Sequence, residues 1–184
     1  MATGRSTQLT RQIGEHLVAT ELGRMGFVAT PFAGNVPNFD LLVANEAGFA
    51  IPVQVKAING GSWQFNATRF LDIEIKNGKQ KVLGPKSTSN PSLVFVLVLL
   101  GGAGKDEFFT LTFKDLQNYF ASTYKRGKRP KNPQSTHCAI QPKDIQKKFT
   151  NWNALLDAFK RIGHKRVQGR IIEMGQRLTK GTTY

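Results

Sequence analysis

An uninterrupted apolar run from Leu93 to Leu100 is the sequence feature that most constrains the fold. The run is far too short to cross a bilayer, because a spanning helix needs about 20 apolar residues. Turn-forming residues border it on both sides, with Asn90-Pro91 before it and Gly101-Gly102 after it. Short apolar runs between turns are typical of buried strands. The chain is therefore predicted to fold around a central buried strand over residues 93–100, paired through a hairpin with residues 107–113.

Helical and strand patterns alternate along the rest of the chain. Apolar residues at helical spacing predict a helix over residues 8–25, which Gly26 ends as a C-cap glycine. Other predicted elements are strands at 27–32, 39–44, 49–57, 63–65 and 73–75, a helix at 112–124 capped by Thr112, and an amphipathic helix at 151–162. This order predicts a single α/β domain with a mixed central sheet flanked by helices. Its core is expected over about residues 8–120, followed by a basic C-terminal extension over about 121–184.

Positive charge is concentrated near the C-terminus. The formal net charge is +14, and residues 125–184 carry 15 lysine and arginine residues against three acidic ones. This asymmetry favours a polyanionic partner such as nucleic acid, and a solvated basic surface is the alternative. The best candidates for phosphate contact lie in one loop that also holds prolines and a glycine: Lys125, Arg126, Lys128, Arg129 and Lys131. Such cations bind the phosphate backbone and do not distinguish base sequence.

The predicted hairpin over residues 39–57 carries polar residues suited to phosphodiester chemistry. Asp40 lies near the start of its first strand, and Gln54 and Lys56 lie two residues apart on the second, so the latter two leave the same face. A divalent cation held by oxygen ligands polarises a phosphate, and a neighbouring lysine can orient the attacking water. Taken singly, Asp40 could cap a turn and Lys56 could be solvated. Their combination with Gln54 on one hairpin favours a site.

Several short motifs follow one another along residues 10–57, namely Gly14-Glu15, Glu21-Leu22, Gly26-Phe27, Asn38-Phe39-Asp40 and Val53-Gln54-Val55-Lys56. In this order they resemble the PD-(D/E)xK nuclease superfamily, and within it they are most similar to archaeal Holliday junction resolvases and related small nucleases. The resemblance implies a restriction-endonuclease-like fold and an endonuclease that uses Mg²⁺ or Mn²⁺ to hydrolyse DNA. Branched or recombination and repair intermediates are the implied substrates. A homodimer is a further expectation, because two strands need two sites.

The resemblance also implies a role for each matching position. Asp40 corresponds to the metal-binding aspartate, Gln54 to a second metal ligand, Val55 to a ligand through its backbone carbonyl, Lys56 to the catalytic lysine, and Glu15 to a helical glutamate that supports the metal. Helical periodicity alone does not choose between Glu15 and Glu21, and only the resemblance favours Glu15.

Two departures from the family pattern affect the expected function. Asn38-Phe39-Asp40 replaces the proline–aspartate pair, and Gln54 stands where the family has glutamate or aspartate. An amide oxygen is a weaker cation ligand than a carboxylate. The alternative is therefore a catalytically inactive DNA-binding protein on the same fold. A third hypothesis is a nucleoprotein-assembly component that works through the basic C-terminal third, and RNA remains open as a substrate.

The remaining chemically notable residues favour structural roles. His137 and Cys138 have no second Cys/His cluster near them in sequence, so a metal site or a nucleophile is not expected there. Trp63 and Trp152 are expected to be core residues, with base stacking as the alternative. The polar N-terminus and the single cysteine favour a cytoplasmic protein with no membrane association.

Overall fold

The computed structural model describes residues 4–32, 38–124, 132–145 and 147–180, and these form a mixed sheet flanked by helices. The five-stranded sheet has the order β1-β2-β3-β7-β8, with β3 and β7 parallel and the other neighbours antiparallel. Its strands are β1 (Val28–Pro31), β2 (Leu41–Ala44), β3 (Ala50–Ile58), β7 (Val94–Leu99) and β8 (Glu107–Thr112). This confirms the predicted α/β fold class and both predicted hairpins.

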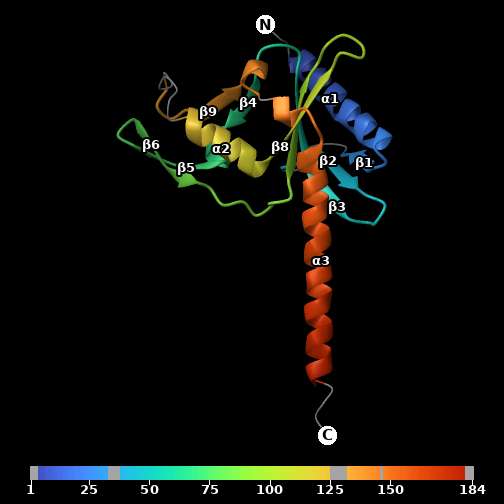
Figure 1. Ribbon diagram of the computed structural model, residues 1–184. Helices are drawn as coiled ribbons and strands as arrows, with labels where there is room; N and C mark the ends of the chain where they lie inside the picture. The colour runs from blue at the N-terminus through green and yellow to red at the C-terminus, as the bar shows by residue number, and fades with distance from the viewer. Residues whose placement is uncertain (1–3, 33–37, 125–131, 146, 181–184) are drawn as a thin grey trace.

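Different layers cover the two faces of this sheet (Figure 1). One face packs against α1 (Gly4–Arg24) and the beginning of α3 (Asn153–Lys180), which continues away from the sheet. The other face carries α2 (Phe113–Thr123) and two small antiparallel sheets. These are β4 (Trp63–Asn66) with β9 (His137–Ile140), and β5 (Leu71–Lys76) with β6 (Lys79–Pro85). Three short 3-10 turns, Ala67–Arg69, Pro142–Asp144 and Lys147–Phe149, complete the described elements.

The apolar run forms β7 and is buried on both faces. Val94, Val96 and Val98 face the layer of α1 and α3. Phe95 and Leu97 face the layer of α2. The prediction of a buried strand is confirmed, but β3 and not β7 is the middle strand of the sheet. The β1–β2 hairpin extends the sheet on the far side of β3, which the local apolar pattern of β7 does not encode.

Pro52 lies inside β3 without disrupting its pairing. It is opposite Leu42 of β2, while the pairing of β3 with β7 begins one residue later, at Val53 and Val94. The position therefore tolerates a residue that lacks a backbone N–H. Val53 and Val55 are buried in the core, so the alternate residues Gln54 and Lys56 leave the opposite face of β3, as predicted.

Both predicted helix caps are present in the structure. Gly26 follows α1 with φ of 85°, and Thr112 and Asp115 form a reciprocal capping box at the start of α2. The helix predicted over 151–162 continues into the tail from Gly163, for which helix and loose chain were both open, and α3 ends at Lys180. Gly163 does not stop the helix, and no proline follows it within α3. Strands β6 and β9 were not predicted.

The C-terminal part of the chain contributes to the cores. Ile140 is buried beside α2, and Leu155 and Ala158 of α3 are buried against the central sheet. Trp63 is fully buried, and its indole N–H donates to the Val98 carbonyl at 3.1 Å. This confirms the prediction that Trp63 is a core residue. None of the described helices combines the length and the apolar character needed to span a bilayer.

Candidate active site

Asp40 is held by backbone contacts where β2 begins. Its own N–H donates to the Val53 carbonyl at 2.9 Å, and its carbonyl accepts from the N–H of Phe32 at 3.1 Å. The side chain is buried, with 8% exposed, and its Oδ2 accepts from the N–H of Val55 at 2.8 Å. A carboxylate tied in this way to a strand backbone has one fixed orientation. Its second oxygen, Oδ1, is turned toward α1.

Glu15 reaches the same place because α1 packs closely on β3 at Gly14. A Cβ atom at Gly14 would lie 2.4 Å from the Cβ of Ala57, which is far closer than two carbon atoms can approach. Only glycine permits this contact. Glu15, the next residue, is buried with 9% exposed.

Replacing Gly14 by alanine is expected to lower the free energy of unfolding by about 1–3 kcal/mol, because the added methyl group pushes α1 away from β3. Gly23→Ala is the matched control on the same helix, since a Cβ there meets no atom within 4 Å. That variant should be stabilised by up to about 1 kcal/mol through helix propensity. Chemical denaturation of the two variants measures both effects. Equal stability of the variants would contradict the close packing of α1.

Arg11 joins the two carboxylates. Its Nε lies 2.7 Å from Glu15 Oε1, and its Nη2 lies 2.9 Å from Asp40 Oδ1. The hydrogen bond to Glu15 and the charges of both carboxylates raise the pKa of Arg11 above its ordinary value, against a smaller opposing effect of burial. Glu21, the alternative to Glu15, pairs instead with Arg24 at 2.5 Å. The fold therefore brings Glu15, and not Glu21, to Asp40.

Gln54 presents a buried oxygen without a partner. Its Oε1 is shielded from solvent and accepts no hydrogen bond from the described residues. A buried acceptor in this state costs about 1–3 kcal/mol. The neighbouring Val55 directs its N–H to Asp40. Because the N–H and C=O of one strand residue point toward the same edge, the Val55 carbonyl also faces the side of β3 on which Asp40 lies.

Lys56 and Arg69 supply positive charge to the cluster. The Lys56 ammonium lies 5.0 Å from the centre of the Phe65 ring. Burial lowers the pKa of Lys56, and the charges of Arg69 and Arg11 lower it further, while Asp40 opposes the shift. Arg69 donates to the Asn38 carbonyl at 3.3 Å, and burial lowers its pKa against the charge of Asp40.

A divalent cation at this place would depend on mixed oxygen ligands. Among the described residues, no group of three or more His, Cys, Asp or Glu side chains could hold a metal. Glu15 and Asp40 supply the carboxylates, and the amide oxygen of Gln54 and the carbonyl of Val55 supply neutral oxygens. This set fits a hard cation, and the unpartnered Gln54 Oε1 is the atom that would gain most from one.

Of the residues predicted for the site, the fold joins Glu15 and Asp40 through Arg11 and ties Val55 to Asp40. Sequence reasoning missed Arg11 and Arg69. The spacing of Arg11 and Glu15 by one helical turn indicates an ion pair, but it does not indicate that Asp40 shares it. Arg69 follows from no local pattern. The predicted basic loop, Lys125, Arg126, Lys128, Arg129 and Lys131, lies outside the described residues.

His137 and Cys138 lie on β9. Among the described residues, they belong to no group of three or more His, Cys, Asp or Glu side chains that could hold a metal. The Nε2 atom of His137 lies 2.6 Å from the Oε1 atom of Gln64 on the paired strand. Burial raises the pKa of the Cys138 thiol to about 12, so this thiol stays protonated near neutral pH. Trp152 packs against Phe108 beside the main core. These positions agree with the structural roles expected for them.

Comparison with known proteins gives similarity at the level of the fold. No protein-family model matches the sequence, and no curated protein matches it. Among solved structures, the chain is similar to a bacterial homing endonuclease, I-Ssp6803I, with a TM-score of 0.43 and 13% sequence identity. The match covers 90% of this chain and 98% of that one. The site described above rests on this chain's own geometry.

Proposed function

We propose that this protein is a nuclease that hydrolyses DNA phosphodiester bonds with the help of Mg²⁺ or Mn²⁺, through a Q-x-K form of the PD-(D/E)xK site. The observation that carries the proposal is the buried Gln54 Oε1, which has no hydrogen-bond partner among the described residues and precedes Val55, whose N–H donates to the buried Asp40 carboxylate. A polar atom that stays unpaired in a folded core calls for a partner. A divalent cation bound between these two side chains would supply one.

Each residue of the cluster has a role in this proposal. Asp40, Gln54, the Val55 carbonyl and Glu15 would hold the cation, which supplies Lewis-acid polarisation of the phosphodiester and promotes ionisation of the attacking water. Lys56 would orient that water and stabilise the charge that builds up on the phosphate. The lowered pKa of Lys56 leaves a larger fraction of its amine unprotonated at a given pH than in an exposed lysine.

The positive charges around the site fit a polyanionic substrate. Arg11 pairs with Asp40, and Arg69 contacts the Asn38 carbonyl two residues before it. Each would pair with a phosphate oxygen once the carboxylates bind a cation. DNA is the proposed substrate, with branched molecules first among those to test because of the resolvase-like motifs. A homodimer would supply the two sites that cleavage of two strands needs.

The test is incubation of the purified protein with branched, single-stranded and duplex DNA, with Mg²⁺ or Mn²⁺ and with a chelator. Cleavage is expected only with the cation. The Asp40→Ala/Lys56→Ala double variant controls for contaminating nucleases. Cleavage that persists in this variant would contradict the proposal. RNA of the same sequences shows whether the sugar matters.

The second candidate is a DNA-binding protein without catalytic activity on the same fold. The ion pairs of Arg11 favour it, because one guanidinium already pairs with both carboxylates without a metal. This candidate predicts salt-sensitive DNA binding with no cleavage under any divalent cation. Failure of Gln54→Glu to create or raise activity would support it.

A further inference from the structure

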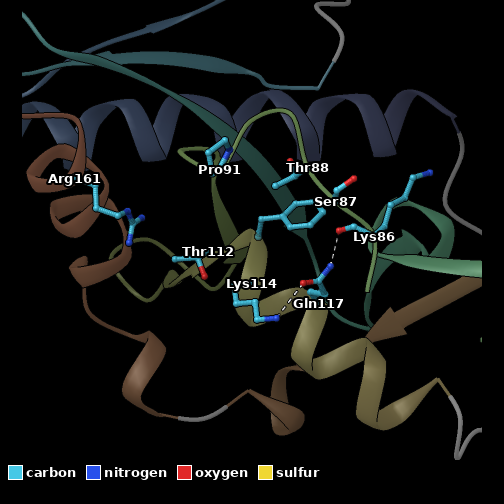
Figure 2. A pocket seen from close by; sticks show the side chains of 9 residues that line it. Lys86, Ser87, Thr88, Pro91, Thr112, Lys114, Gln117 and Arg161 are labelled. Carbon is cyan, nitrogen blue, oxygen red and sulfur yellow. Dashed lines mark hydrogen bonds between the residues drawn. The ribbon is translucent and has the colours of Figure 1, made fainter. Parts of the chain in front are cut away.

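A cavity of about 300 Å³ lies between the start of α2, the chain segment after β6, and α3 (Figure 2). Its lining residues include three cations and no acidic side chain. The cations are Lys86, Lys114 and Arg161, each from a different segment. Ser87 and Thr88 add hydroxyl groups. A concave site with this lining suits a phosphate oxygen, which accepts hydrogen bonds and carries negative charge.

Gln117 makes one wall of this cavity rigid. The side chain is buried, with 6% exposed, and its Nε2 donates to the carbonyls of Phe70 and Lys86 at 3.0 and 2.7 Å. Its Oε1 accepts from the Lys114 ammonium at 3.3 Å. The amide therefore joins the segment after β6 to α2 and orients Lys114 (Figure 2). Less conformational freedom is lost when such a preorganised cation binds its ligand.

The positive charge of the cavity comes from its three cations and not from the N-terminus of α2. Asp115 accepts from the N–H and the hydroxyl of Thr112, and the Thr112 hydroxyl accepts from the N–H of Asp115. This capping box already occupies helix-terminal groups. Arg161 reaches toward this end of α2 from α3 (Figure 2).

Lys86 connects the cavity to the candidate active site. Its N–H donates to the Phe70 carbonyl at 2.9 Å, and its ammonium donates to the Thr68 carbonyl at 3.2 Å. In sequence, Arg69 stands between Thr68 and Phe70, and it contacts the Asn38 carbonyl in the turn that precedes Asp40. Positive charge therefore continues from the site, through Arg69 and Lys86, to the cavity.

We infer that this cavity binds phosphates of the DNA backbone and guides the strand away from Asp40. The inference rests on the proposed function only for the identity of the polyanion. Cations spread over several segments match a repeating row of phosphates better than one small anion. Lys114 and Arg161 are the residues that bind, and Lys86 joins them to the site.

The test is duplex DNA binding to the full chain, measured by fluorescence anisotropy over a range of salt concentrations in a chelator. Lys114→Gln/Arg161→Gln is expected to weaken binding about tenfold and to reduce the slope of log affinity against log salt by about two. Lys105→Gln/Lys160→Gln removes the same charge from exposed positions that do not line the cavity. Its affinity should change less than about threefold by the same reasoning.

Charge-preserving variants guard against a general loss of structure. Lys114→Arg/Arg161→Lys should retain wild-type affinity. Equal losses in the two glutamine double variants, or no loss in either, would overturn the inference. Inorganic phosphate is the second probe. If it perturbs the amide signals of Lys114 while duplex DNA leaves them unchanged, the cavity is a small-anion site and the inference fails.

The outcome is separable from that of the proposed function, because binding is measured without a divalent cation. DNA binding that depends on Lys114 and Arg161, without cleavage under any cation, would support this inference and contradict the nuclease. Cleavage with unchanged binding in the Lys114→Gln/Arg161→Gln variant would contradict this inference alone.

Discussion

Replacing Asp40 by asparagine is expected to lower the rate of cation-dependent DNA cleavage by at least about a thousandfold, which corresponds to about 4 kcal/mol of activation free energy. The change keeps the size of the side chain and an oxygen that can accept from the Val55 N–H. It removes the charge that the proposed site directs to the cation. An amide is a poorer ligand for a hard cation, and Gln54 already supplies one.

DNA binding should survive this substitution. Loss of a negative charge near Arg11 and Arg69 leaves the surface more attractive to phosphates, so affinity is expected to stay equal or to rise. Cleavage is measured by single-turnover assay and binding by anisotropy on the same DNA. Asp157→Asn on α3 is the matched control, because its carboxylate is half exposed and pairs only with Lys160 among the described contacts. An Asp40→Asn protein that keeps full activity would remove Asp40 from the mechanism.

Replacing Gln54 by glutamate is expected to raise the affinity for Mn²⁺ about a hundredfold. A carboxylate at position 54 adds one unit of negative charge at short distance from the proposed cation, where Coulombic attraction is worth a few kcal/mol at an effective dielectric constant of about 20. The change has almost no steric cost, since the two side chains have the same shape. The affinity is measured by isothermal titration calorimetry.

The same substitution should make stability depend on the cation. Without Mn²⁺, a carboxylate whose oxygen is buried without a hydrogen-bond donor destabilises the fold, so the melting temperature should fall below that of the unchanged protein. With Mn²⁺, ligand binding to the folded state should restore or exceed it. Gln168→Glu on α3 adds the same charge at an exposed position and should change neither quantity. Unchanged Mn²⁺ affinity in the Gln54→Glu protein would show that Gln54 does not face a cation.

Local sequence patterns were sufficient to predict most of the fold. The apolar run at 93–100, the alternation over 49–57 and the cap at Thr112 each predict an element that the structure contains. These patterns succeed because burial of one face imposes a period of two or 3.6 on the residues of a strand or helix. The patterns failed where the pairing partner is distant in sequence. Strand β9 pairs with β4, which lies more than 70 residues earlier, at His137 and Asn66.

For the candidate site too, local sequence suggested some residues and tertiary packing decided others. Asp40, Gln54 and Lys56 could be predicted from sequence because one hairpin carries all three, and the spacing of two within a strand decides which side chains share a face. Periodicity left Glu15 and Glu21 equivalent. Tertiary structure decided between them, since the close contact of Gly14 with Ala57 sets where α1 crosses β3.

What the sequence by itself determined is therefore the set of elements and the chemistry that one hairpin can present. Only the tertiary structure decided that Arg11 bridges two carboxylates and that the charge of Asp40 acts on Arg69. It also decided that the Gln54 oxygen is buried with no hydrogen-bond partner among the described residues. The physical reason is that side-chain charge and burial depend on neighbours from other elements. Those neighbours meet only once the sheet, α1 and the 3-10 turn of Arg69 have packed together.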